Sequence, residues 1–260
     1  MAILIDDPAP GVRRLLINRP EKRNAINHDV RQSLIDALTE AREQAACRAI
    51  ILGGVGGMFS AGGDIATMAD LDESGARERM QHIHQLCRLL GQFPMPVISA
   101  VEGICAGAGV GLALLGDVVL AGTKTRFLFP FLKLGLSPDW GLLRTLPARV
   151  GVAEAKRMLT HGQYISAEEA VVAGLADECV GLNVMDSAVS LACRMSRLPR
   201  DAFSRMKNRL DHPSASLAEE LQREEDDQAV LLLGADFREG FAAFAEKREP
   251  QFTSTVDYLV

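Results

Sequence analysis

The sequence predicts an α/β fold with a helical C-terminal region, because apolar, strand-like runs alternate with helix-period segments until about residue 181 and only helical patterns follow. The 260 residues, 48% of them hydrophobic, suffice for one large core. The strand-like runs lie at residues 2–5, 12–18, 48–54, 96–101, 117–122 and 126–130. The helix-period segments lie at about residues 29–46, 74–90 and 106–115, and beyond 181 at 184–198, 201–210, 217–234 and 236–248. We expect a core at 1–195 and a helical region at 196–260.

Composition excludes several classes of protein. The net charge is −6 and acids and bases are interspersed, so no nucleic-acid partner is expected. The first ten residues contain two acids and no basic segment before an apolar run, so we expect no secretory signal and a cytoplasmic location. The five cysteines lie far apart without a CxxC, which argues against a disulfide framework or a metal site. Residues 101–122 are apolar but contain Glu102, Asp117 and many glycines, so a buried segment is favoured over a membrane span.

Two glycine clusters, at residues 53–57 and 107–111, are candidates for ligand contact. A dinucleotide-binding GxGxxG loop would need glycine where the chain has Leu112, so that class is disfavoured. A glycine-rich turn that opens a helix also lets a ligand approach the backbone, where free N–H groups stabilise negative charge. Close packing of the helix is the alternative explanation.

Six segments, in one order, resemble the crotonase, or enoyl-CoA hydratase/isomerase, superfamily. They are residues 17–27, 59–65, 96–122, 127–141 with 146–151, 165–180 and 239–252. The resemblance covers nearly the whole chain. It implies a core of repeated ββα turns (a ββα superhelix), C-terminal helices that form a homotrimer or hexamer, and an acyl-CoA thioester as substrate, with no cofactor besides that coenzyme A.

The resemblance also implies an oxyanion hole. In the family, two backbone N–H groups bind the thioester oxygen and stabilise the enolate formed beside it. By motif position these are the N–H groups of Ala61 and Ala108. Such donors contribute on the order of 3 kcal/mol each to transition-state stabilisation.

Eight residues match the family's coenzyme A contacts. They are Lys22, Arg23 and Ala25 for the nucleotide half, Gly63, Asp64 and Ile65 for adenine and pantetheine, and Phe244 and Lys247 for the coenzyme A of a neighbouring subunit. Outside this motif context, the three cations among them would be interpreted as solvated surface groups.

Both hydratase carboxylates are missing. The family's hydratases have one glutamate in the helix after the oxyanion glycines and a second after the proline of an F-x-x-P-E pattern, where this chain has Gly111 and Phe131. Adding water across a double bond requires one group that deprotonates water and a proton source for the other carbon, so the known route is lost. We expect Gly111 to leave room for an acyl pocket lined by Phe131 and Trp140. Phe127 is expected in the core.

The remaining acid is Asp139, in "LSPDWG". Family isomerases have a similar PD-x-G, and a 1,3-proton shift needs one base that removes a proton and returns it two carbons away. The favoured interpretation is therefore an enoyl-CoA double-bond isomerase with Asp139 as its single acid/base. Alternatives are a hydratase, a nucleophilic Asp139 as in aryl-CoA dehalogenases, or a non-catalytic acyl-CoA binder. A structural alternative for Asp139 itself is the N-cap of the following helix. His82 and His84 do not share a helix face, but either is a candidate for substrate contact.

Overall fold

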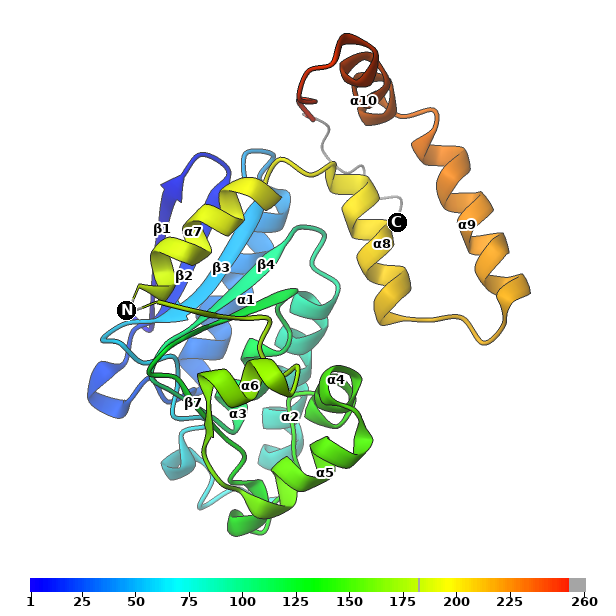
Figure 1. The fold of residues 1–260 in the computed structure, drawn as a ribbon. Helices are drawn as coiled ribbons and strands as arrows, with labels where there is room; N and C mark the ends of the chain where they lie inside the picture. The colour runs from blue at the N-terminus through cyan, green and yellow to red at the C-terminus, as the bar shows by residue number, and fades with distance from the viewer. Residues whose placement is uncertain (182, 253–260) are drawn as a thin grey trace.

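Five of the six predicted apolar runs, together with the short β9, form a six-stranded sheet in the order β1-β2-β3-β4-β6-β9 in a computed structural model, which describes residues 1–181 and 183–252 (Figure 1). The sixth run, at 126–130, contributes to a second sheet. β1 and β2 are antiparallel, and the later neighbours are parallel. The strands are β1 (Ile3–Ala9), β2 (Val12–Ile17), β3 (Ala49–Gly54), β4 (Val97–Val101), β6 (Val118–Gly122) and β9 (Glu178–Val180). The short β9 was not among the predicted strands.

The two faces of this sheet bury alternate residues. Ile50 and Leu52 of β3 belong to the cluster that includes α1 (His28–Glu43) and α2 (Glu73–Gly91). Ile51 of the same strand packs with α7 (Val184–Met195) on the opposite face. Because helices cover both faces, the parallel strands are apolar along their whole length.

A second, three-stranded sheet has the order β5-β7-β8. Its strands are β5 (Ile104–Ala106), β7 (Arg126–Leu128) and β8 (Ile165–Ser166). β4, β5 and α3 (Ala108–Ala113) follow one another, as do β6, β7 and the helices α4 (Leu142–Val150) and α5 (Val152–His161). Each of these two turns thus adds one strand to each sheet before its helix, as expected for the ββα core. Helix α6 (Ala167–Val172) then leads to β9.

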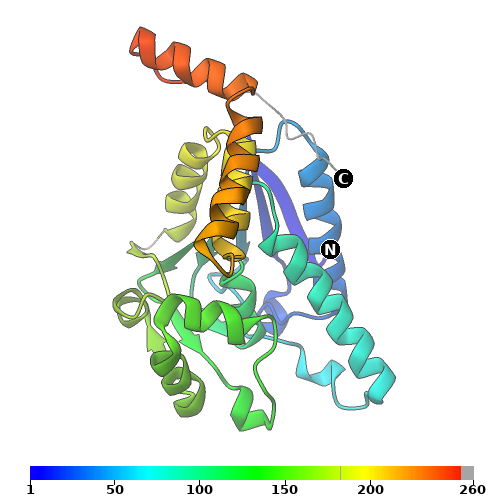
Figure 2. The ribbon, with the colours of Figure 1, turned by 90° about the vertical axis from the view of Figure 1, so that its right-hand side faces the viewer.

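The C-terminal helices are α8 (Arg200–Asp211), α9 (Leu217–Leu231) and α10 (Ala235–Glu246). Figures 1 and 2 show α10 outside the body formed by the two sheets. Helix α8 is joined to the core by the buried Lys207, whose Nζ lies 2.9 Å from Asp117 Oδ1, and by Arg200, which donates to the Arg42 carbonyl. The boundary after residue 195 stays a prediction, and residues 253–260 of the proposed helical region lie outside the described part.

Within the described residues, no helix combines the length and the apolar character needed to cross a bilayer.

Candidate active site

Three backbone segments meet beside β5. Ile26 N–H donates to the Gly62 carbonyl at 2.7 Å, and Asp64 N–H donates to the Ile26 carbonyl at 3.1 Å. On the other side, Ala106 N–H donates to the Ser60 carbonyl at 3.0 Å. Residues from the 17–27, 59–65 and 96–122 motifs are therefore in direct contact, although they are far apart in the sequence.

Two buried polar residues that were not predicted hold these segments together. Asn24 has a left-handed backbone, with φ of 54°, and its amide donates to the carbonyls of Val55 and Met58. The Ser60 hydroxyl donates to the Asn24 carbonyl and accepts from Gly62 N–H. Asparagine tolerates positive φ better than most residues, so Asn24 within "EKRNAIN" was the available indication of a fixed turn.

The register of these segments determines which N–H groups are free. Ala61 N–H donates to the Arg23 carbonyl at 2.9 Å, so it is not available to a ligand. Gly63 pairs with Ile26 in a parallel bridge in which its own N–H points away, and that N–H has no acceptor among the described residues. The prediction for Ala61 is therefore not supported, and Gly63 is the better candidate for this donor.

The second candidate donor is supported by its position. Ala108 is the first residue of α3, and the first N–H groups of a helix have no partner within it. A Cβ on Gly62 would lie 2.8 Å from the Ala106 carbonyl oxygen and 3.7 Å from Ala108 N, and Gly62 has φ of 104°, so only glycine suits this position. The Gly62–Gly63 peptide thus lies against the start of α3, and the N–H groups of Gly63 and Ala108 are near each other.

Asp139 lies in the loop between the 3-10 turn η3 (Phe131–Leu134) and α4, and its Oδ1 is buried without a hydrogen-bond partner. Burial raises the pKa of the carboxyl, and the positive charges of Arg79, His84 and Arg31 partly offset the rise. The N-cap of α4 is Gly141, with no side-chain cap. The interpretation of Asp139 as a capping residue is therefore wrong.

Two arginines that were not predicted flank Asp139. Arg31 of α1 is 3% exposed, and its Nε donates to His82 Nδ1 at 3.3 Å. Burial and the charge of Arg79 lower the pKa of Arg31 to about 10, against the opposing effect of Asp139. Arg31 shares the apolar face of α1 with Leu34 and Leu38, at helical spacings of three and seven, which was the missed indication of a buried cation.

The predicted acyl pocket differs from expectation at Gly111. A Cβ on Gly111 would lie 2.3 Å from Trp140 Cβ, and Trp140 is 1% exposed. The space at Gly111 is filled by Trp140, so the prediction that Gly111 leaves room for substrate is wrong. Phe131 is buried, and its Cζ lies 3.9 Å from where a Cβ on Gly107 would be, next to Ala108. Phe127 lies in the core, as expected.

The predicted coenzyme A residues of the core form one exposed edge. Lys22 and Arg23 are exposed, and Ala25 beside them is partly buried. The Asp64 carboxylate accepts from Arg19 at 3.0 Å, and the adjacent Ile65 is 58% exposed. This edge adjoins Gly63.

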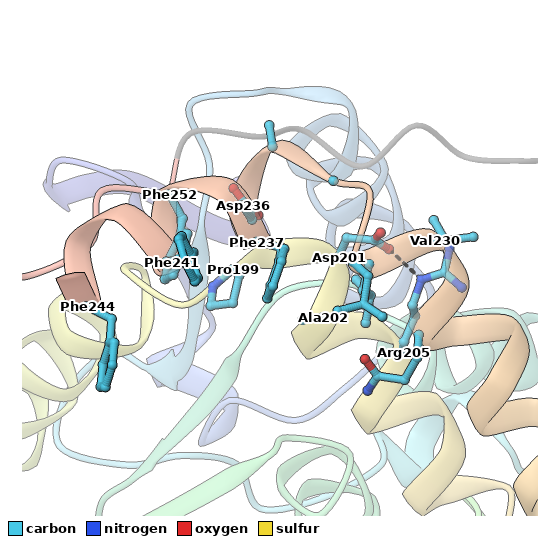
Figure 3. Close-up of a pocket in the computed structure, with 16 residues that line it drawn as sticks. Pro199, Asp201, Ala202, Arg205, Val230, Asp236, Phe237, Phe241, Phe244 and Phe252 are labelled. Carbon is cyan, nitrogen blue, oxygen red and sulfur yellow. Dashed lines mark hydrogen bonds and ion pairs between the residues drawn. The ribbon is translucent and has the colours of Figure 1, made fainter.

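Phe244 and Lys247 lie on and just after α10, away from the other candidate residues of the same chain. Phe244 is 86% exposed and borders an apolar cavity of about 840 Å³ between α8, α9 and α10 (Figure 3). Figure 3 shows Phe237, Phe241 and Phe244 along one helix.

The other histidine candidate, His84, is exposed. Within residues 1–181 and 183–252, no group of three or more His, Cys, Asp or Glu side chains is arranged to hold a metal ion.

Free backbone N–H groups such as those of Gly63 and Ala108 are the arrangement by which enzymes stabilise an oxyanion or an enolate. Residues 9–255 match the enoyl-CoA hydratase/isomerase family. The chain belongs to this family.

Named relatives catalyse different reactions. The chain is 34% identical over 260 residues to 1,2-epoxyphenylacetyl-CoA isomerase of Escherichia coli K12, covering 97% of this chain and 99% of the relative. It is 34% identical over 255 residues to 2,3-dehydroadipyl-CoA hydratase of the same strain, with the same coverage. The crystal structure of an enoyl-CoA hydratase from Bacillus anthracis superposes with a TM-score of 0.92 at 29% identity, covering 97% of this chain and 99% of that one.

Proposed function

We propose that this enzyme isomerises the double bond of an unsaturated acyl-CoA, with Asp139 as its single acid/base. The observation that carries the proposal is the buried, unpartnered Asp139 Oδ1 in a site that has no other carboxylate at the two hydratase positions, Gly111 and Phe131.

The thioester oxygen would accept hydrogen bonds from the Gly63 and Ala108 N–H groups. The Asp139 carboxylate removes a proton from the substrate carbon adjacent to the double bond, and the electron pair moves into the thioester carbonyl to form an enolate or its extended form. The resulting Asp139 carboxylic acid then returns that proton two carbons away. One carboxyl group suffices because it ends the cycle in its starting protonation state.

The surroundings of Asp139 suit both halves of this cycle. A base with an ordinary aspartate pKa is too weak to remove a carbon-bound proton efficiently. Burial raises the pKa of Asp139, which makes its carboxylate a stronger base, while the charges of Arg79 and Arg31 limit the rise and favour the ionised form.

Hydration is the second candidate, because relatives of both kinds match the chain equally well. In that case Asp139 would deprotonate water, and the same group would have to deliver a proton to the neighbouring carbon. A nucleophilic Asp139 is a further possibility, in which its carboxylate would attack the halogen-bearing ring carbon of an aryl-CoA and displace halide to form an aryl ester that water then hydrolyses. An acyl-CoA binder without turnover is the last possibility.

We further propose that coenzyme A lies along the exposed edge at Lys22, Arg23, Ala25, Asp64 and Ile65. The two cations there have no ion pair within the described chain and suit phosphate groups. Ile65 offers an exposed apolar surface next to Gly63 for the adenine or pantetheine.

The C-terminal helices support a proposal of assembly as a homotrimer or hexamer, in which Phe244 and Lys247 reach the coenzyme A of a neighbour. Phe237, Phe241 and Phe244 are all exposed in the isolated chain, and such an apolar patch is typical of an interface. Light scattering at micromolar concentration measures the state directly, and a monomer would contradict this part.

The experiment that tests the function is incubation with a panel of enoyl-, dienoyl- and aryl-CoA esters, with products resolved by chromatography and mass. A product of unchanged mass and altered retention is expected. A gain of one water would establish hydration instead, and stoichiometric binding without product would establish the non-catalytic binder.

A further inference from the structure

The side chains of Arg31 and Asp139 each leave a buried polar atom unmatched. Arg31 Nη1 and Asp139 Oδ1 have no hydrogen-bond partner within the described residues. The two charges influence each other, yet no ion pair joins them. A buried donor and a buried acceptor of this kind are each costly unless a ligand supplies the missing group.

No carboxylate among residues 1–181 and 183–252 forms an ion pair with Arg31. The one hydrogen-bond acceptor of its guanidinium among the described residues is His82 Nδ1. Since Nδ1 accepts, the proton of the His82 ring is on Nε2, which donates to Gln32 Oε1 at 3.1 Å. Burial and the neighbouring charges of Arg31 and His28 lower the pKa of His82, so the ring is neutral at pH 7. The ring orients the guanidinium without compensating its charge.

The region around Asp139 has more positive than negative charge. Arg31 and Arg79 contribute two guanidiniums, and Asp139 supplies at most one carboxylate. Asp64, whose charge also acts on Arg79, is paired with Arg19. The exposed His84 adds no negative charge. One further anion would therefore balance the cluster.

The cluster is also close to the predicted oxyanion hole. Arg79 Nη2 lies 3.4 Å from where a Cβ on Gly63 would be, and the same guanidinium interacts with the charge of Asp139. Gly63 is thus close to Arg79, and the charges of Arg79, Asp139 and Arg31 act on one another. An acyl chain whose thioester is held at Gly63 and whose reacting carbons lie beside Asp139 would lead to Arg31.

We propose that Arg31, with Arg79, binds a carboxylate on the acyl group, so that the substrates are acyl-CoA thioesters with a second, distal carboxylate. The inference rests on the proposed function in so far as the acyl group lies beside Asp139. A guanidinium is the side chain best suited to a carboxylate, because its planar N–H groups donate to both oxygens.

The rival explanation is that Arg31 acts only on Asp139, as a positioning residue that keeps the carboxyl ionised. In that case its removal would affect every acyl-CoA alike. A carboxylate-binding role predicts a loss confined to esters that carry the carboxylate.

The test is calorimetric binding of saturated esters, which need no chemistry. Each ω-carboxyacyl-CoA from four to eight carbons is compared with the hydrocarbon acyl-CoA of the same length. Both esters are titrated into the wild-type protein and into the variants Arg31→Met, Arg31→Lys and Arg77→Met. Arg77 is exposed on α2 and paired with Glu73, so its variant is the matched control. At the chain length that binds best, we expect the wild-type protein to bind the carboxylate ester about tenfold to a hundredfold more tightly than the hydrocarbon ester. This is the effect of one charge-assisted hydrogen bond.

In Arg31→Met, the ratio of the two affinities should fall to about one, while the hydrocarbon ester binds as before. Arg31→Lys should retain part of the preference. Arg77→Met should leave the preference unchanged. No preference in wild type, or equal weakening of both esters in Arg31→Met, would overturn the proposal. If Arg31→Met does not fold, Arg79→Met must lower the preference for the proposal to stand. Turnover of the enoyl esters is measured separately, so an inactive enzyme that keeps the preference would contradict only the proposed reaction.

Discussion

The two sides of the candidate site are built in different ways. The side that would hold the thioester is made of backbone N–H groups, at Gly63 and Ala108, and its segments are held together by hydrogen bonds of the buried Asn24 and Ser60. The side that would carry out proton transfer is made of side chains from separate elements, with buried atoms of Arg31 and Asp139 left unpaired. The first side follows from the fold, whereas the second depends on a few replaceable side chains. A family with a common fold can therefore support several reactions and substrates.

The largest expected effect is on the backbone side. Ala108→Pro removes the N–H, and proline is tolerated at the first position of a helix, so α3 should form. We expect turnover to fall by roughly a hundredfold or more, while the affinity for a saturated acyl-CoA falls much less, because the donor is matched to the enolate. Steady-state kinetics and calorimetry measure the two quantities. Equal losses in both would show that Ala108 has no special role in the transition state.

The packing between the two sides can be tested at Gly111. Helix propensity alone predicts that Gly111→Ala stabilises α3 by about 1 kcal/mol. Contact of the new Cβ with Trp140, at 2.3 Å, predicts instead a loss of about 1–3 kcal/mol in the free energy of unfolding. Urea denaturation gives the sign, and a stabilised variant would show that the space is not occupied as described.

The electrostatics of the side-chain side predict a pH effect. Burial raises the pKa of Asp139 and the charge of Arg79 lowers it, so removing that charge should raise it further. Because the base must be ionised, activity is lost as pH falls through this pKa. The acidic limb of the kcat/KM profile should therefore shift to higher pH in Arg79→Met, with Arg77→Met as the unshifted control. A shift to lower pH would contradict the arrangement of Arg79 and Asp139.

The smallest effect distinguishes Gly63 from Ala61. When an acyl-CoA with an enolised thioester binds, the Gly63 and Ala108 N–H groups would donate to the charged enolate oxygen. Their amide-proton chemical shifts should therefore move downfield in NMR spectra of selectively ¹⁵N-labelled protein. Ala61, which already donates to Arg23, should change little. The reverse pattern would restore the assignment made from the motif.

The sequence predicted the long strands and helices because periodic apolar residues mark them, as in β3 and α1. It did not indicate β5, β8 or β9, of two or three residues each, because such short segments show no period. The three helices α4, α5 and α6 were also absent from the prediction.

In the site, the motif pointed to the segment that contains Gly63, but it could not give the register in which Ala61 N–H is bonded to Arg23. The filling of Gly111 by Trp140 is a contact between residues distant in the sequence, and the electrostatic influence of Arg31 on Asp139 also joins distant residues. Local sequence does not encode such contacts.

The central claim is that Asp139 alone transfers the proton, and isotope incorporation tests it most directly. In deuterated water, the wild-type enzyme should introduce deuterium at the shifted carbon of an isomerised enoyl-CoA, to the extent that the Asp139 carboxyl exchanges its proton before returning it. Asp139→Asn preserves shape, so it should fold and bind acyl-CoA but lose isomerisation and deuterium incorporation by about a hundredfold or more. Near-normal turnover of Asp139→Asn would contradict the single-carboxylate mechanism.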